Sequence, residues 1–165
     1  MRQVVKLLLG LVLIPLLLVP LPLGAVDPGP YQPQDFSRLK GMKGFSDKAL
    51  ELHFALYHGY VKNTNALLET LRTIAPNTPA YAELKRRLGW EYNGMRLHEL
   101  YFGNLGGDGK LNPDSAIAKK IIAQFGSFDN WANDFKATGS MRGIGWVVLY
   151  EDVATGRLIN TWINE

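Results

Sequence analysis

LELHFALYHGYVKNTN, residues 50–65, decides the fold, because it places a histidine and two tyrosines along one amphipathic helix. The seven residues from His53 to Tyr60 turn by about 100° each and fall about 20° short of two full turns, so both side chains share one face. Tyr57 lies on that face too, whereas His58 is rotated about 140° away. The pattern leaves two readings of His53 open: a hydrogen-bonded core histidine or a metal ligand.

The surrounding residues predict a long helix from residue 45 to residue 74. Ser46 is a suitable N-cap, and Asp47 in the first turn suits the positive end of the helix dipole. Apolar residues recur at intervals of three, four and seven positions, at Leu50, Phe54, Tyr57, Val61, Leu68 and Leu71. The proline-containing stretch APNTPA, residues 75–80, is expected to end this helix.

A second helix is predicted from about residue 80 to residue 105, with a possible interruption at Gly89 or Gly94. Its predicted buried stripe is Leu97, Leu100, Tyr101 and Leu105. His98 lies beside this stripe and can be read, like His53, as a core histidine or a ligand. Two histidines on helices that pack antiparallel are a common start to a metal site, although two ligands alone are too few for redox iron or manganese.

The second half of the chain predicts two shorter helices and a β-hairpin. Asn112 and Pro113 are expected to start one helix, and Ser127 is expected to cap the next. WVVLYED and RLINTWIN, residues 146–152 and 157–164, flank the turn VATG and are rich in β-branched and aromatic residues. Two strands alone are marginal in water. The predicted fold class is α+β, with an N-terminal antiparallel helical hairpin and an α/β domain whose small antiparallel sheet is incomplete here.

The N-terminal residues 1–25 have the layout of a secretory signal peptide, with Arg2 and Lys6 before an apolar run and a small-residue exit at Gly24 and Ala25. A retained membrane anchor is the alternative, although three prolines break the apolar run. Without Arg2 and Lys6 the chain has 16 basic and 15 acidic residues, which gives no nucleic-acid footprint. Cysteine is absent, so a disulfide framework is excluded. The location is therefore expected to be secreted or periplasmic, or membrane-anchored if the leader is kept.

Three stretches together resemble the iron/manganese superoxide dismutases. LELHFALYHGYVKNTN is similar to the family's first ligand helix, and YNGMRLHELYFGNL, residues 92–105, is similar to its second. IIAQFGSFDNWANDFKATGSMRGIGWVVLYEDVATGRL, residues 121–158, resembles the family's helix, G-x-G-W strand entry and hairpin. The resemblance extends from residue 45 to residue 165. It implies superoxide as the substrate, one iron or manganese ion per subunit, and a homodimer.

The resemblance assigns roles to five residues. His53 and His98 match the two helical metal ligands, Tyr60 matches the tyrosine that joins the proton-delivering hydrogen bonds, and Trp146 matches the tryptophan that walls the pocket. In the manganese type, a glutamine at the end of the hairpin hydrogen-bonds the metal-bound solvent. Glu165 falls at that position here and is expected to replace this glutamine. The iron type draws that glutamine from the position that is Gly94 here, so the arrangement resembles the manganese type, while the metal itself stays open.

The sequence also departs from the family. The interval from His53 to Tyr60 is shorter than usual, Tyr57 stands where a histidine is common, and the loop before His98 is shortened. The family's remaining two ligands, an aspartate and a histidine, belong to a segment that would follow the hairpin. We therefore expect the sequence to be a fragment of a dismutase; the alternative is a protein that ends at Glu165.

The predicted organisation is a signal peptide at 1–25, a linker at 26–44 that is extended or disordered, a helical hairpin domain at 45–108 and a C-terminal α/β domain at 109–165. The predicted activity is metal-dependent disproportionation of superoxide to dioxygen and hydrogen peroxide. Two alternatives remain: a non-catalytic, dismutase-like periplasmic module that binds a partner, and a membrane-anchored structural protein unrelated to dismutases. GGDGK, residues 106–110, has neither the spacing of a phosphate loop nor the residues that follow the lysine in such a loop.

Overall fold

The computed structural model of the chain describes residues 29–164. In order, the elements are a short 3₁₀ helix η1 and then α1, α2, α3, α4, β1 and β2. Their bounds are η1 Ser37–Leu39, α1 Asp47–Thr73, α2 Pro79–Gly103, α3 Ala116–Phe125, α4 Phe128–Gly139, β1 Trp146–Glu151 and β2 Leu158–Ile163. The α+β class and the N-terminal helical hairpin are confirmed. The leader lies outside the described residues, as does Glu165. No helix among residues 29–164 combines the length and the apolar character needed to span a membrane.

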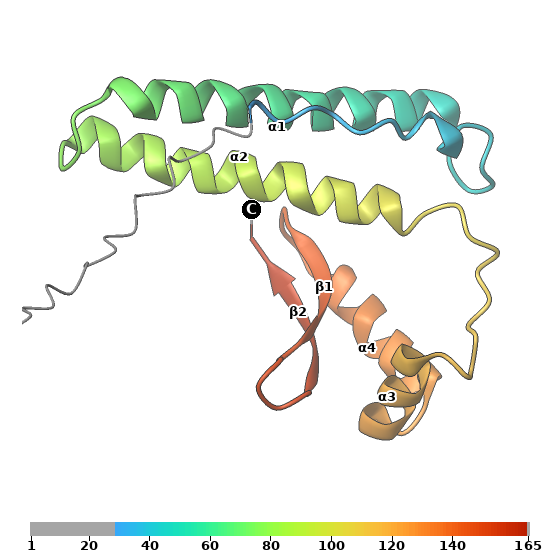
Figure 1. The fold of residues 1–165 in the computed structure, drawn as a ribbon. Helices are drawn as coiled ribbons and strands as arrows, with labels where there is room; N and C mark the ends of the chain where they lie inside the picture. Colours follow the sequence, from blue (N-terminus) through green and yellow to red (C-terminus); the bar gives the residue numbers. More distant parts are fainter. Residues whose placement is uncertain (1–28, 165) are drawn as a thin grey trace, which may run out of the picture.

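Helices α1 and α2 form an antiparallel pair along their whole length (Figure 1). The predicted cap of α1 is confirmed, since the Ser46 side chain accepts a hydrogen bond from the Ala49 backbone N–H at 3.1 Å. Thr78 caps α2, and Pro79 occupies its first turn. Backbone N–H groups there have no partner within the helix, so the missing N–H of proline costs no hydrogen bond. The possible interruption of α2 was wrong, because the helix runs through both Gly89 and Gly94.

The main core lies between α1, α2 and the segment that precedes them. Its buried members are Phe36, Leu39, Leu50, Tyr57, Tyr60, Val61, Met95 and Phe102. The predicted stripe of α1 is correct at Leu50, Tyr57 and Val61, but Leu68 is exposed. On α2 the prediction was wrong at Leu100, which is 61% exposed, while Met95 and Phe102 fill the core instead. Tyr101 and Leu105 of the predicted stripe are partly buried and pack against this core, so the prediction for α2 was correct in part.

Residues 29–39, here called the N-terminal arm, run along the helical hairpin. Their first part is extended, as predicted, but the arm is not a free linker, since Phe36 and Leu39 are buried in the core. The Tyr31 backbone N–H donates to the Asn65 Oδ1 at 2.8 Å, and the Asn65 Nδ2 donates back to the Tyr31 carbonyl at 2.9 Å. The arm is thus held against α1 by a reciprocal pair of hydrogen bonds.

The C-terminal part packs α3 and α4 against a two-stranded antiparallel sheet. The register pairs Trp146 with Ile163 and Glu151 with Leu158, so the predicted hairpin is confirmed. Ser127 caps α4 as predicted, whereas α3 begins at Ala116 behind a Ser115 cap, so the predicted start at Pro113 was wrong. The tip of β1 reaches α2 and brings Trp146 to the helical hairpin (Figure 1).

Candidate metal centre

His53 and His98 face each other across α1 and α2. Their ring centroids are 4.8 Å apart and their planes are nearly perpendicular, at 82°. His98 is buried, and His53 is partly buried. The structure therefore brings together the two histidines that the sequence selected, at the separation that two ligands of one small ion would have.

One hydrogen bond fixes the protonation of His98. Its Nδ1 lies 2.6 Å from the Gly94 carbonyl oxygen. A carbonyl can only accept, so Nδ1 carries the proton and Nε2 keeps its lone pair. This carbonyl-to-imidazole contact is the arrangement that orients many histidine ligands toward a metal.

Burial keeps both imidazoles neutral, which is the form that binds metals. Desolvation lowers the pKa of His53, and the neighbouring His98 lowers it further. Desolvation also lowers the pKa of His98, although its hydrogen bond to Gly94 works in the opposite direction. A metal ion would therefore meet little competition from protons at neutral pH.

Tyr60 and Trp146 lie beside this pair. The Tyr60 ring is buried, with its centroid 5.1 Å from that of His98. The Trp146 ring meets His98 edge to face at 4.8 Å, and its Nε1 is buried with no hydrogen-bond partner among residues 29–164. A buried donor without a partner suits a place where a polar group is to be bound. Glu165 lies outside the described residues, so its role stays a prediction.

The donor set is suited to iron or manganese but is half of what such an ion needs. Within residues 29–164, no group of three or more His, Cys, Asp or Glu side chains could hold a metal ion. Two neutral imidazoles with one fixed tautomer fit the nitrogen half of a redox-metal shell. The described residues therefore fit part of the shell of such an ion, and its remaining ligands would have to come from outside residues 29–164.

Two further aromatic residues complete the walls, and the sequence analysis gave neither a role at the site. The ring of Tyr101 lies 5.4 Å from that of His53 and 6.1 Å from that of Trp146. Phe102 lies 4.9 Å from His53. The signal that could have found them was their position at i+3 and i+4 from His98, which places them on the same side of α2.

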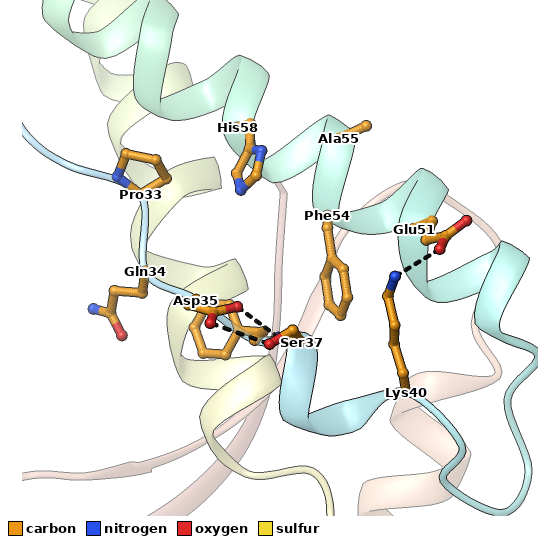
Figure 2. Close-up of a pocket in the computed structure, with 10 residues that line it drawn as sticks. Pro33, Gln34, Asp35, Ser37, Lys40, Glu51, Phe54, Ala55 and His58 are labelled. Carbon is orange, nitrogen blue, oxygen red and sulfur yellow. Dashed lines mark hydrogen bonds and ion pairs between the residues drawn. The ribbon is translucent and has the colours of Figure 1, made fainter.

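His58 stands apart from the histidine pair, as its rotation on the helix predicted. It lines a pocket of about 450 Å³ between α1 and the N-terminal arm (Figure 2). Around this pocket Lys40 forms an ion pair with Glu51 at 2.7 Å, and the Asp35 carboxylate accepts hydrogen bonds from both the backbone N–H and the hydroxyl of Ser37. Each of these three charged side chains is therefore already engaged by another group of the protein.

The chain is similar to known proteins of one family. The profile of iron/manganese superoxide dismutases, C-terminal domain, matches residues 113–165. The chain is 32% identical over 109 residues to superoxide dismutase [Mn] 1 of Haloferax mediterranei, covering 65% of this chain and 75% of that protein. The chain belongs to the iron/manganese superoxide dismutase family. The reading as a structural protein unrelated to dismutases was therefore wrong.

Iron-type members of the dismutase family match as well. Superoxide dismutase [Fe] of Aquifex aeolicus is 37% identical over 137 residues, covering 78% of this chain and 64% of the relative. That of Cupriavidus metallidurans is 37% identical over 130 residues, covering 75% of this chain and 65% of the relative. This dismutase-family chain thus spans a little under two thirds of the length of these curated relatives.

Proposed function

We propose that the protein is a superoxide dismutase that uses iron or manganese. The observation that supports this most directly is the His53–His98 pair at 4.8 Å, with His98 held in the tautomer that leaves Nε2 available. The same pair would be costly for a purely structural core, because one buried and one partly buried imidazole leave polar atoms that need partners. The chain has relatives named as iron enzymes and relatives named as manganese enzymes, so the proposal includes either metal.

In this proposal each residue has a distinct task. His53 and His98 hold the metal through their ring nitrogens, and Trp146 and Tyr101 exclude bulk water around them. When bound, the metal supplies one-electron chemistry, in which one superoxide is oxidised to dioxygen and a second, with two protons, is reduced to hydrogen peroxide. Tyr60, beside His98, is the phenol that passes protons to the second superoxide.

Export and dimerisation are part of the same proposal. The arrangement of charge, apolar run and small residues over residues 1–25 supports a secreted or periplasmic enzyme, or an anchored one if the leader is kept. Family membership supports a homodimer. Cell fractionation with N-terminal sequencing of the purified protein tests the leader, and analytical ultracentrifugation tests the dimer.

The test of the activity uses protein expressed from the whole reading frame of the source gene. His53→Gln and His98→Gln should each remove most bound metal and lower the dismutation rate at least about tenfold, because a first ligand is lost. His58→Gln is the matched control, since it changes a histidine on the same helix outside the pair. Dismutation that survives in His98→Gln would contradict the proposal.

One observation supports the second candidate, a non-catalytic dismutase-like module that binds a partner in the periplasm. Within residues 29–164 the two histidines have no third ligand beside them. The two candidates differ in metal content: the whole-frame protein should contain about one iron or manganese ion per chain if it is the enzyme. A folded protein that contains no metal and does not dismutate superoxide would favour the module.

A further inference from the structure

We propose that Tyr57 is a positioning residue for His98 and that, through the Tyr57 hydroxyl, the N-terminal arm becomes part of the metal centre. The proposal rests on the proposed function for its meaning, because it concerns how a ligand is held. Tyr57 occupies a place where this chain departs from the family's usual histidine.

The hydroxyl of Tyr57 joins three segments of the chain. It accepts a hydrogen bond from the Gln34 backbone N–H at 2.9 Å and donates one to the Glu99 Oε1 at 3.0 Å. Gln34 belongs to the arm, Tyr57 to α1 and Glu99 to α2. The hydroxyl therefore uses both its acceptor and its donor capacity on groups from different segments.

The contact with α2 is made at the residue next to His98. Glu99 is held in place by Arg96, whose Nη1 lies 2.6 Å from the other carboxylate oxygen of Glu99. The Tyr57 ring itself lies 6.3 Å from the His98 ring, at an angle of 28°. Tyr57 thus binds the side chain of the residue that follows His98, and its ring lies beside the imidazole in a nearly parallel plane.

The arm is anchored firmly enough to serve as the fixed point of this arrangement. Arg38 donates from Nη1 to the Leu105 carbonyl and from Nη2 to the Phe102 carbonyl, each at 3.1 Å, which ties the arm to the end of α2. Phe36 packs against the rings of Tyr57 and Phe102 at 5.7 and 5.0 Å. Figure 2 shows Gln34 and its neighbours running beside α1. The arm therefore contacts both ligand helices at the level of the histidines.

Packing alone does not account for a tyrosine here. A phenylalanine would fill the same buried space, and a buried hydroxyl is favourable only with partners. Removing the hydroxyl would leave the Gln34 N–H and the Glu99 carboxylate without their shared partner, and unpaired polar groups in a partly buried site are unfavourable. The expected consequence is movement at Glu99 and, one residue away, a loss of order in the His98 imidazole.

The test is nitrogen-15 NMR of histidine side chains in the metal-free 165-residue chain, with Tyr57→Phe compared with wild type. Wild type should show one His98 tautomer, protonated at Nδ1. Tyr57→Phe should show exchange between tautomers or broadened signals, and a dissociation constant for Co²⁺ raised about tenfold. Tyr81→Phe is the control, because it removes a phenol hydroxyl at the start of α2.

A lowered unfolding midpoint in Tyr57→Phe with unchanged His98 signals would overturn the proposal and leave Tyr57 a packing residue. If Tyr57→Phe does not fold, Glu99→Gln and Glu99→Leu decide: the amide oxygen can still accept from Tyr57 and should preserve the His98 signals, whereas leucine should not. Identical His98 signals in these two variants would also overturn it. The NMR result does not depend on dismutation, so failure of the proposed function is seen separately.

Discussion

Gly94 shapes the candidate centre through the side chain that it lacks. A Cβ at this position would lie 2.4 Å from the Tyr60 Cδ1 and 2.5 Å from its Cε1, which is far closer than carbon atoms approach. The Tyr60 ring therefore rests directly on the α2 backbone, one turn before His98. The same residue supplies the carbonyl that fixes the His98 tautomer. One glycine thus positions both the ligand and the tyrosine beside it.

Gly94→Ala should destabilise the protein by about 1–3 kcal/mol, because the new methyl group must displace the buried Tyr60 ring. Urea unfolding monitored by circular dichroism measures the change. Gly89→Ala is the matched control in the same helix: a Cβ there meets nothing within 4 Å, so it should stabilise by about 0.5–1 kcal/mol through helix propensity. Equal effects of the two substitutions would refute the role given to Gly94.

The lowered pKa values of His53 and His98 predict how the metal-free protein responds to acid. The unfolded chain titrates near 6.5, above the folded pKa of each group, so it binds more protons as the pH falls below that value. The stabilising contribution is complete above about pH 6.5 and is lost as the pH falls toward the folded pKa values. Unfolding by urea in EDTA at pH 7.5 and at pH 5.5 should show this loss.

The control for this pH dependence is His53→Gln, which replaces one of the two titrating groups with a neutral side chain. Its stability should fall less between the two pH values than that of wild type. A slope that stays the same in His53→Gln and in His98→Gln would mean that other groups cause the acid sensitivity.

Among the elements, α2 is where sequence reasoning succeeded least, and the cause is the polarity of its buried face. Apolar spacing predicted a stripe through Leu100, but the face that meets α1 contains Glu91, Gly94 and His98. Glu91 is buried because Arg87 and Asn63 bind its carboxylate, at 2.7 and 3.2 Å. When a helix buries polar groups, its apolar residues recur less regularly along the sequence. Their spacing then predicts the wrong residues as buried.

The β-hairpin of β1 and β2 and the helix α1 were predicted well because the local sequence decides them. Ser46 and Ser127 each cap the first turn of the helix that follows them. In the β-hairpin, two strands rich in β-branched residues are joined by a short turn. The arm was missed because its order comes from distant partners such as Asn65 and Tyr57, which the local composition of a proline-rich stretch cannot show. His53 was found because it shares a helical face with Tyr60, and His98 because it lies beside the predicted stripe of α2 and matches the family's second ligand helix. Phe102 was not recognised as part of the site.

Asn160 joins β2 to α4 and gives a test at the scale of these elements. Its Oδ1 accepts from the Trp131 Nε1 at 2.9 Å, and its Nδ2 donates to the Asp134 Oδ2 at 2.7 Å. Asn160→Ala should cost about 1–3 kcal/mol, since the half-buried indole N–H and the carboxylate lose their partner. Ile159→Thr on the same strand, at an exposed position, should change stability by about 0.5 kcal/mol or less. Thermal unfolding compares the two.

Over the whole molecule, the candidate centre is assembled from parts that are far apart in the sequence. α1 contributes His53 and Tyr60, α2 contributes His98, and the first residue of β1 contributes Trp146. The two halves of the chain therefore meet at the histidine pair. Metal binding should consequently couple the stability of the helical hairpin to that of the C-terminal sheet.

The 165-residue chain itself should hold its metal weakly. Its described residues supply two neutral imidazoles and no third ligand, and redox iron or manganese sites want four or more ligands including solvent. Equilibrium dialysis against Mn²⁺, followed by elemental analysis, should give well under one ion per chain, with a dismutation rate near background. His53→Gln should bind still less, while His58→Gln should equal wild type. Tight, stoichiometric manganese or iron in the purified 165-residue chain would refute this, and would require that residues outside 29–164 complete the shell.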